Sequence, residues 1–127
     1  MKRIVVQALL VISIVVFLVK TAQAQHAQNP IIFADVPDIS MIRVGDTYYM
    51  SSTTMHLSPG LPIMKSKDLA NWRLINYAYD TLASIDELNL VNGKSTYGKG
   101  SWASSLRYHN GTYYVTTFAQ TTGKTYV

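Results

Sequence analysis

Short apolar runs separated by turn residues make up most of the chain after its first two dozen positions. Runs rich in tyrosine, valine, isoleucine and threonine predict β-strands. The expected strands are residues 39–44, 47–54, 63–66, 72–78, 104–108, 112–119 and 124–127. A polar insertion at 81–99 is either irregular or helical. The pattern therefore predicts an all-β chain with one long insertion.

Two turns join four of these strands into hairpins. Gly45-Asp46 separates 39–44 from 47–54, and Asn110-Gly111 separates 104–108 from 112–119. Asn-Gly between two apolar runs is a strong hairpin signal because both residues adopt positive φ angles easily. Each turn is therefore expected to connect adjacent antiparallel strands.

The two hairpins resemble each other in sequence. Arg43 and Arg107 are 64 positions apart, and Tyr48 and Tyr113 are 65 positions apart. A repeat of this length with four short strands is typical of a propeller blade, and chance likeness between two β-rich segments is the alternative. Because the second repeat stops inside its third strand, we expect the amino-terminal piece of a longer chain, with about one and a half blades.

Residues 1–24 have the pattern of a secretory signal peptide. Lys2 and Arg3 precede the apolar stretch 4–19, and Ala22-Gln23-Ala24 offers small residues for cleavage. A membrane anchor is the alternative, but the stretch is shorter than the ~20 residues that span a bilayer. We therefore expect a secreted or periplasmic protein without stable membrane insertion, in which residues 25–127 form the mature part.

The composition narrows the classes of partner. The 127 residues include no cysteine, which excludes a disulfide framework and a thiolate metal site. The formal net charge is +4, but three of the eleven basic residues lie in the leader. The remaining eight basic residues are nearly balanced by seven carboxylates, so the mature part is close to neutral. Nucleic-acid binding needs clustered cations that displace phosphate counterions. No nucleic-acid partner is therefore expected.

Asp38 is the candidate carboxylate for chemistry because it stands directly before the first predicted strand. Pro37 biases Val36 toward an extended conformation, so Asp35 and Asp38 are expected to face opposite ways and not to form a carboxylate pair. Asp38 would lie at the mouth of the strand, whereas Asp35 would brace the entry loop. An ordinary turn start at Pro37-Asp38 is the alternative.

Two further residues are candidates for ligand contact. His56 follows a strand end, where loops often carry function, although a surface position without function is its alternative. Trp102 begins the inner strand of the second repeat, at the position that matches the Asp38 region, and aromatic faces stack on sugar rings. No pair of histidines has metal-ligand spacing, so the sequence predicts no metal site.

The ordered motifs resemble the amino-terminal part of glycoside hydrolase family 43, whose members are five-bladed β-propellers. The resemblance is carried by Asn29-Pro30-Ile31, Pro37-Asp38-Ile39-Ser40 and residues 42–49, 60–63, 66–72, 100–103 and 107–114. It implies that residues 25–127 are the amino-terminal part of such a catalytic domain. It also implies an inverting hydrolase of β-xylosides or α-L-arabinofuranosides in plant cell-wall hemicellulose.

The resemblance also implies roles for individual residues. The catalytic base of the family's P-D-P-S motif falls on Asp38, with Ile39 in place of the second proline. Trp102 and His56 would contact the sugar, and a glutamic acid beyond Val127 would protonate the leaving oxygen. The fragment alone would therefore be inactive. No cofactor is implied, although a propeller channel has room for a structural calcium ion.

One departure from the family pattern keeps a second reading open. Trp102-Ala103-Ser104-Ser105 has serine where many relatives carry W-A-P-D, whose aspartate tunes the pKa of the acid. A non-catalytic propeller that binds plant cell-wall oligosaccharide or polysaccharide is therefore the alternative. A membrane-anchored β adaptor is a third reading, which would require an uncleaved leader.

Overall fold

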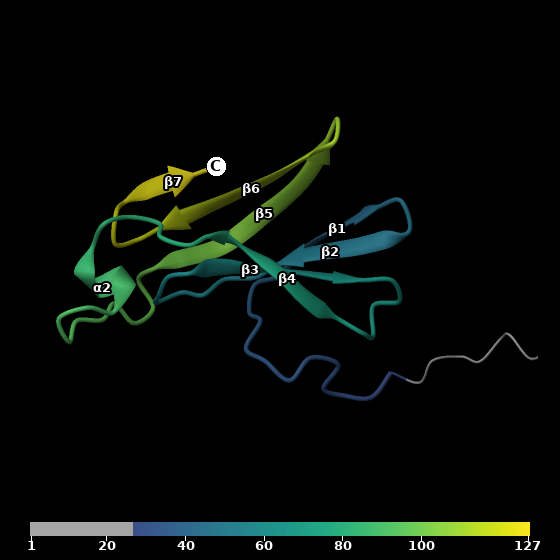
Figure 1. Ribbon diagram of the computed structural model, residues 1–127, viewed down its shortest axis with the longest axis horizontal. Coiled ribbons are helices and arrows are strands. Elements are labelled where there is room, and N and C mark those ends of the chain that lie inside the picture. Colours follow the sequence, from purple (N-terminus) through teal and green to yellow (C-terminus); the bar gives the residue numbers. More distant parts are fainter. Residues whose placement is uncertain (1–26) are drawn as a thin grey trace, which may run out of the picture.

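The computed structural model describes residues 27–127 and shows two antiparallel β-sheets that pack against each other (Figure 1). The first sheet has the order β1-β2-β3-β4 and the second the order β5-β6-β7. The strands are β1 (Ser40–Val44), β2 (Thr47–Ser51), β3 (Gly60–Ser66), β4 (Arg73–Tyr79), β5 (Ser101–His109), β6 (Thr112–Ala119) and β7 (Lys124–Tyr126). The expected all-β fold, with one four-stranded blade and part of the next, is confirmed. The predicted leader 1–24 lies outside the described residues.

Both predicted hairpins are confirmed. The first closes with Val44 opposite Thr47, and Gly45 has a φ of 60°. The second closes with His109 opposite Thr112, and Asn110 and Gly111 have φ angles of 47° and 82°. Two successive positive φ angles match the twist of the flanking strands, which explains why Asn-Gly stands there.

Three strand boundaries differ by three residues from the sequence-based expectation, and the other differences are of one residue. β2 ends at Ser51 instead of continuing to 54, β3 begins at Gly60 instead of 63, and β5 begins at Ser101 instead of 104. Pairing is irregular between Ile63 and Met64 in β3 and between Ser101 and Ser104 in β5. Bulges of this kind interrupt the alternation of apolar and polar residues, which is the signal that sequence reasoning uses.

The polar insertion contains one short helix, α2 (Asp86–Asn89), which buries Leu88. The Leu88 carbonyl accepts a hydrogen bond from the Ser58 amide at 2.9 Å, so the insertion is attached to the loop between β2 and β3. No helix within residues 27–127 has the length and apolar character needed to cross a membrane.

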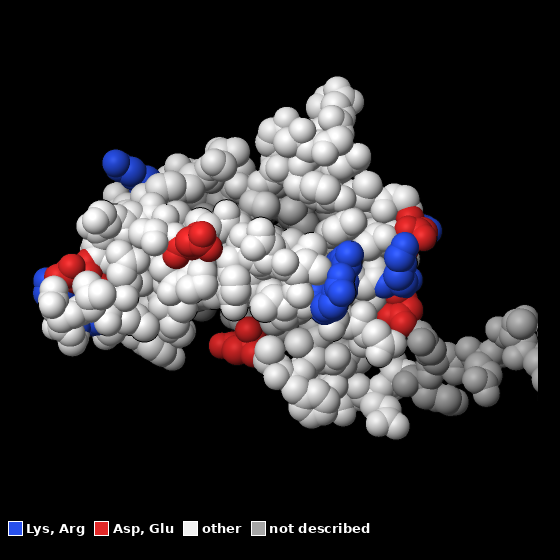
Figure 2. Space-filling view, viewed as in Figure 1, with Lys and Arg blue, Asp and Glu red and all other residues white. Residues whose placement is uncertain are grey.

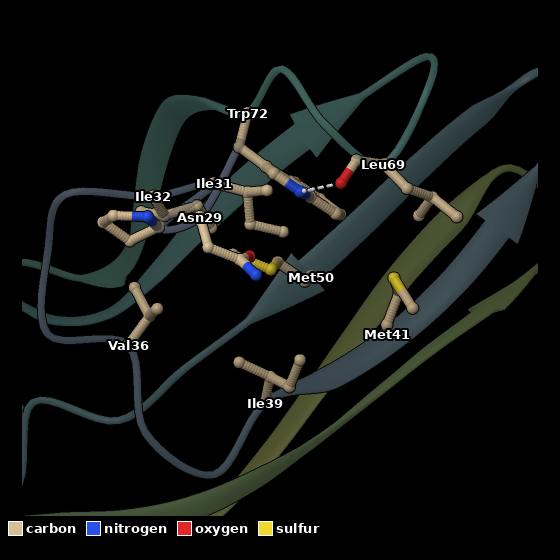
Figure 3. A pocket seen from close by; sticks show the side chains of 10 residues that line it. Asn29, Ile31, Ile32, Val36, Ile39, Met41, Met50, Leu69 and Trp72 are labelled. Atoms are coloured by element: carbon tan, nitrogen blue, oxygen red, sulfur yellow. Dashed lines mark hydrogen bonds between the residues drawn. The ribbon is translucent and has the colours of Figure 1, made fainter. Parts of the chain in front are cut away.

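The two faces of the first sheet have different chemistry. Ser40 and Ser51 face the second sheet, where the Ser40 Oγ accepts from the Leu106 amide at 3.0 Å and the Ser51 and Ser104 hydroxyls lie 2.7 Å apart. On the opposite face, Met41 and Met50 line an apolar hollow of about 490 Å³ (Figure 3). The apolar hollow contains no carboxylate, so we place no acid–base chemistry there.

The junction between the sheets is rich in buried hydroxyl groups. Thr53 is 3% exposed, and its Oγ1 donates to the Ser101 carbonyl while accepting from the Met55 amide at 2.9 Å. The Tyr79 hydroxyl donates to the Ser101 Oγ at 2.7 Å. Because each of these groups is buried or half-buried, each bond also satisfies a polar atom that would otherwise be costly to desolvate.

Gly100 permits the close approach of the two sheets. Its amide donates to the Met55 carbonyl at 2.6 Å. A Cβ at this position would lie 2.9 Å from the Met55 carbonyl carbon and 3.0 Å from the His56 amide nitrogen. Since a side chain cannot fit there without moving backbone, the contact requires glycine.

Replacing Thr53 by valine is expected to destabilise the fold by about 2–3 kcal/mol, because the Ser101 carbonyl and the Met55 amide would both lose a buried partner. Thr53→Ser keeps the hydroxyl and serves as the matched control, with a smaller loss. Urea unfolding of the protein and both variants measures the difference. Equal stability of wild type and Thr53→Val would show that this hydroxyl does not hold the sheets together.

Candidate active site

Asp38 lies on an exposed segment directly before β1. Its φ of 51° is in the left-handed region, which few residues other than glycine adopt and which Asp tolerates better than most. The preceding residue is fixed, because the Pro37 carbonyl accepts from the Ser52 Oγ at 2.7 Å and from the Thr53 amide at 3.4 Å. Two residues later, Ser40 is held by Leu106. The backbone that carries the Asp38 carboxylate is therefore held on both sides.

The ion pairs of the described residues leave Asp38 out. They join Lys67 to Asp46 and Lys94 to Asp86 and Glu87. An exposed carboxylate without a paired cation can accept a proton or a hydrogen bond from a ligand. The position of Asp38 is therefore compatible with a general base.

His56 is half-buried in the loop after β2, and its ring stacks on Tyr97 with centroids 4.8 Å apart and planes 18° apart. It lines a cavity of about 180 Å³ together with Asp35, Pro37 and Thr53. Its Nδ1 is buried and has no hydrogen-bond partner among residues 27–127. A buried polar atom without a partner is unusual in a folded protein, which makes this ring a candidate for a ligand contact.

Trp102 lies in the irregular part of β5, between Ser101 and Ser104. Its Nε1 donates to the Gly98 carbonyl at 3.1 Å, and its ring meets Phe118 edge-on with centroids 6.1 Å apart. The residue is 42% exposed. A ring that is fixed by a hydrogen bond and still exposed has the properties of a stacking platform.

Thr53 relates the three candidate residues to one another. Its amide contacts Pro37, the neighbour of Asp38, and its hydroxyl contacts Ser101, the neighbour of Trp102. His56 follows three positions later in the same loop. Asp38, His56 and Trp102 therefore come from one end of the two sheets, although none of them hydrogen-bonds to another within the described part of the chain.

Two residues of this region were missing from the sequence-based set. Thr53 connects the segments, and Tyr97 supports the His56 ring. Consecutive hydroxyl residues at the end of a strand were the available signal for Thr53, but such residues are usually exposed. Nothing in the sequence indicated that Tyr97, 41 positions from His56, would lie against it.

Asp35 and Asp38 differ in their relation to the His56 cavity. Asp35 lines the His56 cavity, whereas Asp38 does not. This agrees with the expectation that the two carboxylates face different ways. The sole glutamate of the sequence, Glu87, lies in α2 with its carboxylate 3.9 Å from Lys94.

No group of three His, Asp or Glu side chains within residues 27–127 has the arrangement of a metal site. Two expectations stay predictions: that the protein needs no cofactor, and that the propeller channel can hold a structural calcium ion.

Comparisons with known proteins agree on one family. The family model described as glycosyl hydrolases family 43 matches residues 27–127. A β-xylosidase of Formosa agariphila is 46% identical over 88 residues, which are 68% of this chain and 14% of that protein. A non-reducing end alpha-L-arabinofuranosidase of Bacteroides ovatus is 42% identical over 108 residues, covering 84% of this chain and 20% of that protein.

A solved structure supports the same relationship. The bifunctional GH43-CE protein of Bacteroides eggerthii is 75% identical and superimposes with a TM-score of 0.71, over 78% of this chain and 14% of that one. The chain thus spans 14% to 20% of the length of these three relatives. Since the family model extends over all the described residues, the chain belongs to glycosyl hydrolases family 43.

Proposed function

We propose that this chain supplies the general base of an inverting glycoside hydrolase that cleaves β-xylosides or α-L-arabinofuranosides of hemicellulose. The observation that carries the proposal is Asp38, an exposed carboxylate on a backbone held at Pro37 and Ser40. The names of the relatives in Formosa agariphila and Bacteroides ovatus support this substrate class.

In the proposed reaction, the Asp38 carboxylate accepts a proton from a water molecule while that water attacks the anomeric carbon. The bond from this carbon to the leaving oxygen breaks, and a general acid supplied by another part of the protein protonates that oxygen. Inversion requires a separation of ~6.5 to 9.5 Å between the two carboxyl groups, so that the water fits between them. Groups on different blades that face a common hollow can meet this requirement.

His56 and Trp102 supply binding in this proposal. Trp102 would stack on a sugar ring, and the buried Nδ1 of His56 would accept or donate a hydrogen bond to a hydroxyl in the cavity beside Thr53. The leader pattern of residues 1–24 favours export, which would place the hydrolase where cell-wall polysaccharide occurs.

A non-catalytic carbohydrate-binding propeller is the second candidate, and the serines at Ser104 and Ser105 favour it. The Ser104 hydroxyl hydrogen-bonds to Ser51, so this serine contributes to the contact between sheets. If no other part of the protein supplies the aspartate that tunes the pKa of the general acid, the site would still bind sugars through His56 and Trp102 but would not hydrolyse them.

Asp38→Asn is expected to lower the hydrolysis of aryl β-xylosides or aryl α-L-arabinofuranosides by about 10³-fold or more, because an amide has the same shape but cannot take up the proton. Initial rates of the complete catalytic domain measure the effect. Asp46→Asn, the same change at the other end of β1, is the control and is expected to keep wild-type rates. Retained turnover in Asp38→Asn with an unchanged melting temperature would remove Asp38 from the mechanism.

Trp102→Ala is expected to raise KM roughly fivefold with a smaller change in kcat, because one stacking interaction is worth about 1 kcal/mol. Trp102→Phe retains an aromatic face and is expected to recover most of the affinity. Steady-state kinetics on a xylo-oligosaccharide or arabino-oligosaccharide distinguishes the variants. An unchanged KM in Trp102→Ala would show that the ring does not contact substrate.

A further inference from the structure

A pair of cations lies at the end of the first sheet that is remote from Asp38. Asp38 precedes the Ser40 end of β1, which pairs with Ser51, whereas the opposite end of the hairpin pairs Val44 with Thr47. Lys65 in β3 is close to this second end, because it is the direct partner of Tyr49 in β2. Lys65 also lies directly opposite Arg73 in β4.

Two like charges in direct cross-strand register disfavour the sheet. Neither Lys65 nor Arg73 takes part in an ion pair with another residue of 27–127. A cation pair that destabilises its own sheet and has no carboxylate partner is therefore suited to an anionic ligand.

Two carboxylates lie near this pair, and each has hydrogen-bond or ion-pair partners other than Lys65 and Arg73. The Asp46 carboxylate lies 2.6 Å from the Lys67 Nζ. Asp68 accepts hydrogen bonds from the amides of Ala70 and Asn71 and from the Ser66 hydroxyl, and the Asn71 and Ala70 donors hold the pKa of Asp68 well below its usual range. In Figure 2, basic and acidic side chains lie next to one another around the β3–β4 turn. Neither Asp46 nor Asp68 forms an ion pair with Lys65 or Arg73, and the cations outnumber the carboxylate in the hollow that Asp68 shares with them.

A hollow and an aromatic surface adjoin the cations. The hollow has a volume of about 330 Å³, and its lining holds three cations and one carboxylate among polar residues: Lys65, Lys67, Arg73, Asp68, Thr47, Ser66 and Asn71. Tyr49, the cross-strand neighbour of Lys65, has its ring centroid 5.0 Å from that of Tyr113 in the second sheet.

The aromatic surface continues across the second sheet. The Tyr113 ring centroid lies 4.9 Å from that of Tyr108, and these residues are 42% and 43% exposed. The neighbouring Tyr49 side chain raises the pKa of Tyr113 to about 12. A neutral phenol can exchange hydrogen bonds with sugar hydroxyls. Cross-strand register and ring contacts thus connect five residues, which we call the tyrosine–lysine row: Arg73, Lys65, Tyr49, Tyr113 and Tyr108.

We propose that the tyrosine–lysine row is a second saccharide-binding site that selects hemicellulose chains with uronic-acid substituents. Lys65 and Arg73 would bind the carboxylate, and the tyrosines would stack on neighbouring sugar rings. The choice of hemicellulose as the ligand rests on the proposed function, whereas the preference for an acidic saccharide rests on the charges themselves. Such a site would retain a branched polymer while Asp38 acts at the other end of the sheet.

The test measures binding of two probes to the complete protein carrying Asp38→Asn, so that no hydrolysis occurs. The probes are xylotetraose bearing a 4-O-methylglucuronic acid and unsubstituted xylotetraose, each titrated calorimetrically. The acidic probe is expected to bind more tightly and to weaken as NaCl rises from about 50 to about 500 mM. Lys65→Ser/Arg73→Ser is expected to weaken the acidic probe roughly tenfold and to leave the neutral probe unchanged.

The matched control is Lys94→Ser/Lys124→Ser, which removes the same charge elsewhere and is expected to bind both probes as the parent does. Equal affinity for the two probes would overturn the proposal, as would an equal loss in both double variants. Protection of Lys65 from acetic anhydride in the ligand-free complete protein would also overturn it, because another part of the protein would then cover the row. Aryl glycoside hydrolysis with Asp38 intact tests the proposed function separately and is expected to be unchanged in Lys65→Ser/Arg73→Ser.

Discussion

The hydroxyl group of Thr53 is the interaction on which the arrangement of the candidate site depends. It joins the loop after β2 to the first residue of β5, while the amide of the same residue reaches the Pro37 carbonyl. A single buried residue thus relates the segment before Asp38 to the segment before Trp102. Hydrogen bonds have defined directions, whereas apolar burial is non-directional. The relative placement of the two segments is therefore determined more strictly than apolar packing alone would allow.

Buried hydroxyl groups also explain how the two sheets can pack against each other beside the His56 cavity. Ser51, Ser52, Thr53 and Ser101 are all buried, and each is satisfied by a group from another segment or sheet. Met41 and Met50, by contrast, line the apolar hollow on the opposite face of the first sheet. The two faces thus differ in chemistry, because one keeps buried hydroxyl groups at the contact between the sheets and the other supplies apolar surface.

The predictable parts of this molecule were those with local causes. Asn110-Gly111 predicted its hairpin because the turn needs two positive φ angles, and Pro37 before a strand indicated that Asp38 would stand at the strand entrance. The contact between Thr53 and Ser101 spans 48 positions and leaves no periodic signal. The same cross-sheet bonds end β2 early and start β5 early, which is why those boundaries escaped prediction. The stacking of Tyr97 on His56 could not be predicted either, because it also joins residues far apart in the sequence.

The glycine at position 100 has a consequence for how specificity can change in this fold. Main-chain atoms of Gly100 and Met55 touch directly, so backbone contact, together with the Thr53 hydroxyl, sets the spacing between the loop that carries His56 and the strand that carries Trp102. Side chains around the His56 cavity other than Thr53 can therefore be exchanged without altering the separation between this loop and β5. Substitution of these side chains, in evolution or by design, could change ligand specificity while the backbone positions around the cavity stay the same.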